Sequence, residues 1–319
     1  MTQQQAIGGY FELELRQGQE FHATAIALNS ARHCLEYILR TRHYKKVYIP
    51  YYTCEVILEP FRKLGVGYEF YSINSQLEPI QYPTLKAEEA FLYTNYFGLK
   101  QKAVERIAER YGKQAIIDNA QAFYAPHLPG IDTFYSPRKF FGVADGGYLY
   151  TDAPPLPDIP QDSSWQRMQH LLRRIDEGAE AGYEDFRTNS KSLVNAPIRR
   201  MSPLTHAILA SVDYDSAKNK RLENYEILAK ALQHKNAIHI SPDNEDVPLI
   251  YPFYADTQNL RHQLILHRIF VATYWPNVFT WCGPTDYEYQ LAQNTLPLPI
   301  DQRYSPEHLQ FIIDTITAS

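Results

Sequence analysis

Short apolar strand patterns alternate with helical patterns through the first half of this chain. The strand patterns are rich in valine, isoleucine, tyrosine and phenylalanine, and they lie at residues 47–50, 68–71, 90–94, 114–118, 132–135 and 147–150. Apolar residues with helical spacing lie at residues 31–39, 54–64 and 102–111, and glycines follow the last two. This alternation predicts an α/β fold with a mostly parallel sheet sandwiched by helices.

The ends of these predicted strands carry the polar side chains. Asp118 ends one strand, Asn95 follows another, and Ser30 precedes the first helix as a natural N-cap. Ligands of parallel α/β sheets bind beyond the carboxyl ends of the strands. We therefore expect the functional site of the chain at that edge of the sheet.

The second half predicts a smaller unit. A loop rich in proline and aspartate covers residues 153–162, and two mostly helical stretches follow at 163–178 and 203–234. Strands are expected at 238–240, 249–253 and 270–274, a helix at 260–269, and a last helix after Ser305. The 319 residues are thus expected to form a large α/β domain, 1–234 with an N-terminal arm at 1–22, and a small α+β domain, 235–319.

Charge and cysteine content exclude several functional classes. The net charge is -5 and no lysine- or arginine-rich block stands out, so nucleic-acid binding is not indicated. The N-terminal residues lack the pattern of a secretory signal, and no apolar run approaches the length of a membrane span. The three cysteines and the histidines show no metal-ligand spacing. We therefore expect a cytoplasmic protein that binds no membrane and no metal.

One pair of residues predicts the chemistry. Asp118 lies at a strand end, and Lys139 follows about twenty residues later in a loop that closes on Asp145, Gly146 and Gly147. A lysine amine can hold pyridoxal 5'-phosphate as a Schiff base, and a buried carboxylate keeps the pyridine nitrogen protonated. The phosphate requires a helix N-terminus, which Ser30 provides. The alternative for Lys139 is an ordinary surface lysine.

The order of several short motifs resembles the DegT/StrS family of fold-type I, aspartate-aminotransferase-like, pyridoxal-phosphate-dependent sugar aminotransferases. The family's phosphate turn resembles residues 30–35, its proline-x-x-threonine strand end 50–53, its aspartate-x-alanine-glutamine motif 118–121, its lysine loop 139–147, its arginine-methionine-serine helix start 200–202 and its leucine-proline-leucine-proline segment 296–299. These matches follow one another in order across nearly the whole chain.

The resemblance implies roles for individual residues. Lys139 would form the internal aldimine and move protons, and Asp118 would pair with the pyridinium, so that these two are the expected catalytic residues. Cofactor contacts are implied for Ser30, Ala31, Arg32, Thr53, Cys54, Asp118, Gln121, Ser136 and Lys139. Substrate contacts are expected for Asn95 and Tyr52.

The chain departs from the family at several places: it is shorter than the family norm, and its lysine loop is one residue shorter than usual. Ala31 replaces a glycine, and Cys54 stands where the family often has an aromatic residue that stacks on the ring. Ser136 lies closer to the lysine than the family's serine does. The asparagine that reaches a neighbouring subunit's phosphate is missing near Ile198, with Asn195 as a candidate substitute.

The resemblance implies a transferase that aminates a keto-sugar in polysaccharide or secondary-metabolite biosynthesis, with the nucleotide-linked sugar as the expected form. It also implies an amino acid as donor and a homodimer as the expected assembly. Two alternatives stay open at this point. The chain could retain the fold for a binding or structural role with lost or altered activity, or it could be a pyridoxal-phosphate enzyme that acts on a non-sugar substrate.

Overall fold

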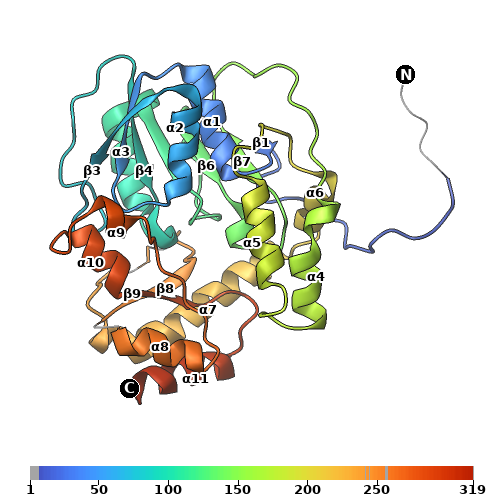
Figure 1. Cartoon of the computed structure of the whole chain (residues 1–319), viewed down its shortest axis with the longest axis vertical. Helices are drawn as coiled ribbons and strands as arrows, with labels where there is room; N and C mark the ends of the chain where they lie inside the picture. The colour runs from blue at the N-terminus through green and yellow to red at the C-terminus, as the bar shows by residue number, and fades with distance from the viewer. Residues whose placement is uncertain (1–6, 241, 244, 256–257, 319) are drawn as a thin grey trace.

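The computed structural model describes residues 7–240, 242–243, 245–255 and 258–318 of the chain. Figure 1 shows two parts: a large sheet with helices on its sides, and a smaller C-terminal part, coloured orange to red. Among the described residues the helices are α1 (Ala31–Arg42), α2 (Leu58–Leu64), α3 (Gln101–Tyr111), α4 (Gln169–Asp176), α5 (Tyr183–Ser192), α6 (Pro203–Ala210), α7 (Tyr214–Leu232), α8 (Gln258–Leu266), α9 (Val278–Trp281), α10 (Tyr287–Asn294) and α11 (Pro306–Thr317).

The large sheet is mostly parallel, as the sequence predicts. Within the described part of the chain it has seven strands in the order β1-β7-β6-β5-β4-β2-β3. Strands β2 to β6 pair in parallel, whereas β7 pairs antiparallel with both β6 and β1. The strands are β1 (Ile26–Leu28), β2 (Lys46–Pro50), β3 (Gly67–Tyr71), β4 (Glu89–Thr94), β5 (Ala115–Asn119), β6 (Asp132–Tyr135) and β7 (Gly147–Tyr150).

Both faces of this sheet are buried, and alternate residues of each strand enter different cores. Leu92 and Ile116 belong to the core that also contains the apolar side chains of α1 and α2. Phe91 and Ile117, their neighbours in sequence, belong to the core on the opposite face, which includes the apolar side of α3. Because successive side chains of a strand point to opposite faces, runs that are apolar throughout are what a sheet covered on both sides requires.

Helix α1 begins where the sequence predicts, after Ser30. The backbone of Ser30 is extended, and its hydroxyl accepts a hydrogen bond from the backbone N–H of His33 at 3.2 Å. This is the bond that an N-cap serine makes to the third residue of a helix. The amides of Ala31 and Arg32, at the first two positions of α1, have no acceptor within the helix. The N-terminus of α1 therefore presents backbone N–H groups at the carboxyl edge of the sheet, next to the backbone bridge between Ser30 and Gly146.

The double glycine that follows Lys139 brings strand β7 against this helix terminus. A Cβ atom on Gly147 would lie 2.4 Å from the carbonyl carbon of Ser30, and Gly146 has a φ of +122°. Any side chain at Gly147 would therefore collide with the backbone at the start of α1. The preceding acid, Asp145, is buried and accepts hydrogen bonds from the N–H and the hydroxyl of Ser202 at 2.9 and 2.8 Å. It ties the lysine loop to the start of α6.

The C-terminal part is built on two antiparallel strands, β8 (Ile250–Tyr254) and β9 (Thr295–Pro299). Helices α8 and α11 contact each other, and α7 contacts both β8 and α11. The division into domains after residue 234 stays a prediction. Helix α7, which precedes that boundary, packs on the C-terminal strands, and Figure 1 shows it beside them.

Two strands predicted in this part are wrong. At residues 238–240 the side chain of Asn236 accepts hydrogen bonds from the N–H groups of Ile238 and Tyr254, so a side chain replaces the strand ladder. At residues 270–274 the guanidinium of Arg261 donates to the carbonyl of Ala272 at 2.8 Å, and no β-strand is formed. Strand β9 was not predicted, because its alternating prolines resemble a loop.

The N-terminal arm leaves the body of the molecule. Residues 1–6 of the predicted arm lie outside the described residues, and the chain from residue 7 extends away from the sheet (Figure 1). Ile7, Tyr10 and Phe11 are more than 90% exposed. Of the helices that the structure describes, none combines the length and the apolar character that crossing a bilayer requires.

Candidate active site

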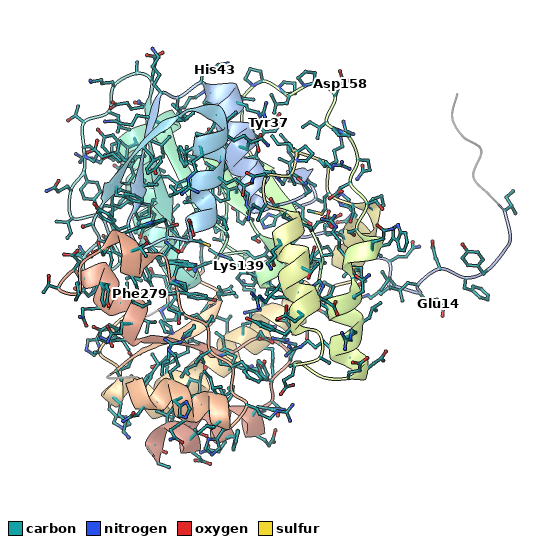
Figure 2. The ribbon with its side chains drawn as sticks, in the orientation of Figure 1. Glu14, Tyr37, His43, Lys139, Asp158 and Phe279 are labelled. Carbon is teal, nitrogen blue, oxygen red and sulfur yellow. The ribbon has the colours of Figure 1, made fainter. Side chains whose placement is uncertain are left out.

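A cavity of about 370 Å³ lies at the carboxyl edge of the large sheet. This volume is in the usual range of small-molecule sites, roughly 300–1,000 Å³. Figure 2 places Lys139 near the centre of the molecule, between the sheet and the C-terminal part in this view. The cavity is lined by eight of the residues for which the sequence predicts a role: Ser30, Ala31, Arg32, Thr53, Cys54, Asp118, Ser136 and Lys139.

Lys139 and Asp118 line this cavity together. Lys139 lies in a 3-10 turn, Pro137–Lys139, directly after β6, and its side chain is exposed to the cavity. Asp118 lies near the end of β5, the strand that pairs with β6. The Lys139 ammonium is close enough to lower the pKa of Asp118 electrostatically. The two groups that the sequence predicts at one site therefore meet there.

Burial dominates the electrostatics of Asp118. Removal from water raises the pKa of this carboxyl group, while the Lys139 ammonium and a hydrogen bond from the Ala120 N–H hold it down. The Ala120 N–H donates to Oδ1 at 2.8 Å, which fixes the orientation of the carboxylate. A fixed, half-buried carboxylate beside an amine can hold the proton of a bound heterocycle.

The hydroxyl of Ser30 is engaged within α1, and the cofactor contact predicted for this residue stays a prediction. The Nε2 of His33 lies 3.0 Å from the carbonyl oxygen of Ala196, which only accepts, so this nitrogen carries the ring proton. Burial lowers the pKa of His33 to about 4, so the ring is neutral and Nδ1 is an acceptor. The Ser30 hydroxyl, 2.8 Å away, therefore donates to Nδ1. An anion in the cavity would therefore bind at the start of α1 through groups other than this hydroxyl proton.

Several lining residues were not predicted to belong to the site. Helix α5 covers the cavity with Phe186 and Ser190, and Leu193 follows it. Arg138, the neighbour of Lys139, also lines the cavity and donates to the hydroxyl of Ser190 at 3.3 Å. The position of Arg138 beside Lys139 is visible in the sequence, but its burial under α5 depends on residues some fifty positions away.

Three residues with predicted roles do not line the cavity. Gln121 accepts a hydrogen bond from the N–H of Phe97 at 2.8 Å, and Asn95 accepts one from the N–H of Lys100 at 3.0 Å. Both amides thus hold the loop after β4. Tyr52 is fully buried, with its ring against Trp275 at a centroid distance of 4.9 Å. In the structure these side chains serve packing and loop geometry, and their predicted cofactor and substrate contacts stay predictions.

A second, larger cavity of about 660 Å³ also reaches Lys139. It lies between the lysine loop, helices α4 and α5, and the segment after β9. Its lining carries one carboxylate, Asp301, and a series of cationic groups: Arg138, Lys139, Arg174, Arg221 and Arg303. The chamber is therefore strongly positive, and it shares Arg138, Lys139 and Phe186 with the first cavity.

Comparison with known proteins places the fold. No family model matches the sequence, and no curated protein sequence matches it. Solved structures do match. A DegT DnrJ EryC1 StrS aminotransferase from Brucella abortus is 16% identical, with a TM-score of 0.62 over 92% of this chain and 85% of that one. The sugar aminotransferase CalS13 from Micromonospora echinospora is 13% identical, with a TM-score of 0.62 over 93% of this chain and 88% of that one.

NtdA from Bacillus subtilis, solved with bound cofactor PMP, is 15% identical. Its TM-score is 0.64 over 92% of this chain and 72% of that one. These structures cover both parts of the chain. The expected fold-type I architecture is therefore confirmed, as a likeness of fold.

Proposed function

We propose that this chain, which has the fold of the sugar aminotransferases, is a pyridoxal-phosphate-dependent aminotransferase that acts on a nucleotide-linked keto-sugar. One observation carries the proposal: Asp118 and Lys139 line the same cavity as the N-terminus of α1. An amine, a carboxylate and an anion-binding helix end are the three groups that this cofactor requires. A protein that kept this fold only for a binding or structural role would not need all three groups in one cavity.

The residues of the cavity fit pyridoxal phosphate. The half-buried carboxylate of Asp118 would face the ring nitrogen, and the helix start at Ala31 and Arg32 would face the phosphate. Thr53, Cys54 and Ala120 offer small side chains along the cavity, which leaves room for a flat ring. Ala31 in place of glycine is compatible with this site, because a cavity remains with this residue in its lining.

The chemistry assigns one task to each of two side chains. When bound, the cofactor supplies an electron-accepting ring and a carbon that exchanges amino groups. The amine of Lys139 is the nucleophile that attaches it and, once released, the base that accepts and returns a proton at the substrate carbon beside the nitrogen. The carboxylate of Asp118 keeps a proton on the ring nitrogen, which it can do because Ala120 holds it in place.

The function is tested on the wild-type protein. Mixing it with pyridoxal phosphate should produce a visible absorption band, and L-glutamate should then bleach this band while 2-oxoglutarate is released in equal amount. A keto-sugar nucleotide should restore the band. A protein that takes up no cofactor would refute the proposal, and one that is bleached by glutamate but restored only by non-sugar ketones would refute the substrate.

The second cavity supports an anionic acceptor. Five cationic side chains and one carboxylate line it, and Asp301 is already paired with Arg303 at 2.6 Å. Arg221 is buried and stacks over the Phe140 ring with its guanidinium carbon 4.5 Å from the ring centroid. A diphosphate-linked sugar would bring negative charge into this chamber and its carbonyl towards Lys139.

Arg174 is the cationic group of this chamber best suited to a test, because it is exposed on α4. Replacing Arg174 with methionine should raise the KM for a diphosphate-linked keto-sugar about tenfold and leave kcat unchanged, since one contact between opposite charges is lost. Steady-state kinetics measure both constants. The matched control is Arg173→Met, because Arg173 pairs with Glu177 and Asp185 and does not line the cavity. Equal KM values for the two variants would contradict an anionic substrate there.

A homodimer and a cytoplasmic location complete the proposal. Ile7, Tyr10 and Phe11 of the arm, and Ile175 of α4, expose apolar side chains that a second copy could cover. The three cysteines are free thiols, which suits a reducing compartment. Sedimentation velocity should give a mass of two chains, and removal of residues 1–13 should shift it towards one. A wild-type monomer at micromolar concentration would contradict the dimer.

A further inference from the structure

The strongest unexplained feature of the site is the guanidinium of Arg138. Its Nε is buried and has no hydrogen-bond partner among the described residues. One terminal nitrogen donates to the hydroxyl of Ser190 at a long 3.3 Å. Burial lowers the pKa of Arg138 to about 10. A guanidinium has five N–H groups, and burying them without acceptors is costly.

The carboxylates that pair with Arg32 and Arg167 do not pair with Arg138. Within the described part of the chain no carboxylate lies within 4.0 Å of it, the limit for an ion pair. Glu59 is paired with Arg32 at 2.6 Å, and Asp162 is paired with Arg167 at 2.7 Å. Asp145 attracts Arg138 electrostatically, but its oxygens accept hydrogen bonds from Ser202.

Other cations make the place more positive still. The guanidinium groups of Arg32 and Arg167 both lower the pKa of Arg138, because their positive charges lie close enough to repel its own. Arg32 has a buried Nε without a partner as well. Arg32, which is also paired with Glu59, lines the same cavity as Arg138, together with residues at the start of α1 and Ser190. This end of the cavity therefore gathers donors that suit an anion.

We propose that Arg138, assisted by Arg32, binds the phosphate group of the cofactor within a single chain. This inference rests on the proposed function. A phosphate monoester carries a charge of about −1.5 to −2 and three acceptor oxygens, which matches two guanidinium groups, two amides and a hydroxyl. The family's serine and asparagine would otherwise contact this phosphate. Here Ser136 lies closer to the lysine than that serine does, and the asparagine near Ile198 is missing. The charge of Arg138 replaces these contacts.

The same arrangement explains the position of α5. Ser190 of this helix accepts from Arg138, and Arg32 donates to the carbonyl of Leu193 at 2.8 Å. Asn195, the candidate substitute for the missing asparagine, donates its backbone N–H to Glu59 at 2.7 Å. The segment from α5 to residue 195 thus closes the anion end of its own chain's cavity, so this end is complete without a second copy.

The test compares two cofactor forms that differ only in the phosphate. Equilibrium binding of pyridoxal phosphate and of pyridoxal is measured by absorbance and fluorescence titration of the apo protein. Wild type should prefer the phosphorylated form strongly. Arg138→Met should weaken pyridoxal phosphate binding by ~10- to 100-fold, because a charge-assisted hydrogen bond to the phosphate is lost. Pyridoxal binding should be unchanged. Arg138→Lys, which keeps the charge but not the fork of donors, should lie between the two.

The control is Arg167→Met, because the positive charge of Arg167 also repels that of Arg138 but Arg167 lines neither cavity. It should keep the wild-type preference for the phosphorylated form. Circular dichroism of the apo variants separates misfolding from lost binding. If Arg138→Met does not fold, the binding preference of Arg138→Lys decides the test. An Arg138 variant that is folded and retains the full preference overturns the inference but not the proposed function. A wild type that binds neither form overturns both.

Discussion

Replacing Lys139 with alanine is expected to abolish the visible absorption band of the cofactor-loaded protein and to lower the rate of amino-group transfer by about 10³-fold or more. The alanine variant lacks both the nucleophile that attaches the cofactor and the base that moves the proton. Because Lys139 is exposed to the cavity and makes no ion pair among the described residues, its loss should not unfold the protein. Absorption spectra and single-turnover rates with L-glutamate measure both effects.

The control for this experiment is a second substitution at the same position. Lys139→Arg keeps a cation beside Asp118, but a guanidinium does not act as a nucleophile at neutral pH. It should therefore be as inactive as the alanine variant, which separates the loss of the amine from the loss of the charge. A Lys102→Ala variant, at an exposed lysine that pairs with Asp243, should behave as wild type. Retention of the absorption band by Lys139→Ala would place the reactive amine elsewhere.

Replacing Asp118 with asparagine should lower the rate of the half-reaction with L-glutamate by about 10²- to 10³-fold, while cofactor binding persists. Asparagine has the same shape, and its carbonyl oxygen can still accept from the N–H of Ala120. It lacks the negative charge that keeps the ring nitrogen protonated. Rapid-mixing measurements of the bleaching rate test this, and a folded Asp118→Asn variant with the wild-type rate would remove Asp118 from the catalytic role.

The same substitution should not destabilise the apo protein at pH 7. Burial raises the pKa of Asp118 above its ordinary value, so the folded protein holds this proton more readily than the unfolded chain does. The ionised group therefore opposes folding once the pH exceeds the unfolded pKa, and a neutral asparagine removes that cost. Thermal unfolding of apo wild type and variant at pH 7 should give an equal or a higher Tm for Asp118→Asn. A catalytic loss without a loss of stability would mark the group as one kept for function.

Much of the large sheet could be predicted from local patterns. The strands at 47–50, 68–71, 90–94 and 114–118 occur as expected, within a residue or two, because apolar runs flanked by turns are readable in sequence. The starts of α1 and α11 follow from their serine caps. Helix α5 escaped prediction, since its exposed face carries Tyr183 and Phe186 where a polar pattern is expected. The strand predicted at 270–274 is absent, and there the Arg261 side chain donates to the carbonyl oxygens of Val271 and Ala272.

For this protein the order of the residues alone determined the alternation of strands and helices, and with it the edge of the sheet where Asp118 and Lys139 meet. It also determined the glycine pair that lets β7 approach α1. Only the tertiary structure decided that the Ser30 hydroxyl is engaged by His33, and that Arg138 is buried under α5 without an acid. The reason is physical: strand and helix patterns arise between near neighbours, whereas the hydration and charge of a side chain depend on segments brought together only by folding.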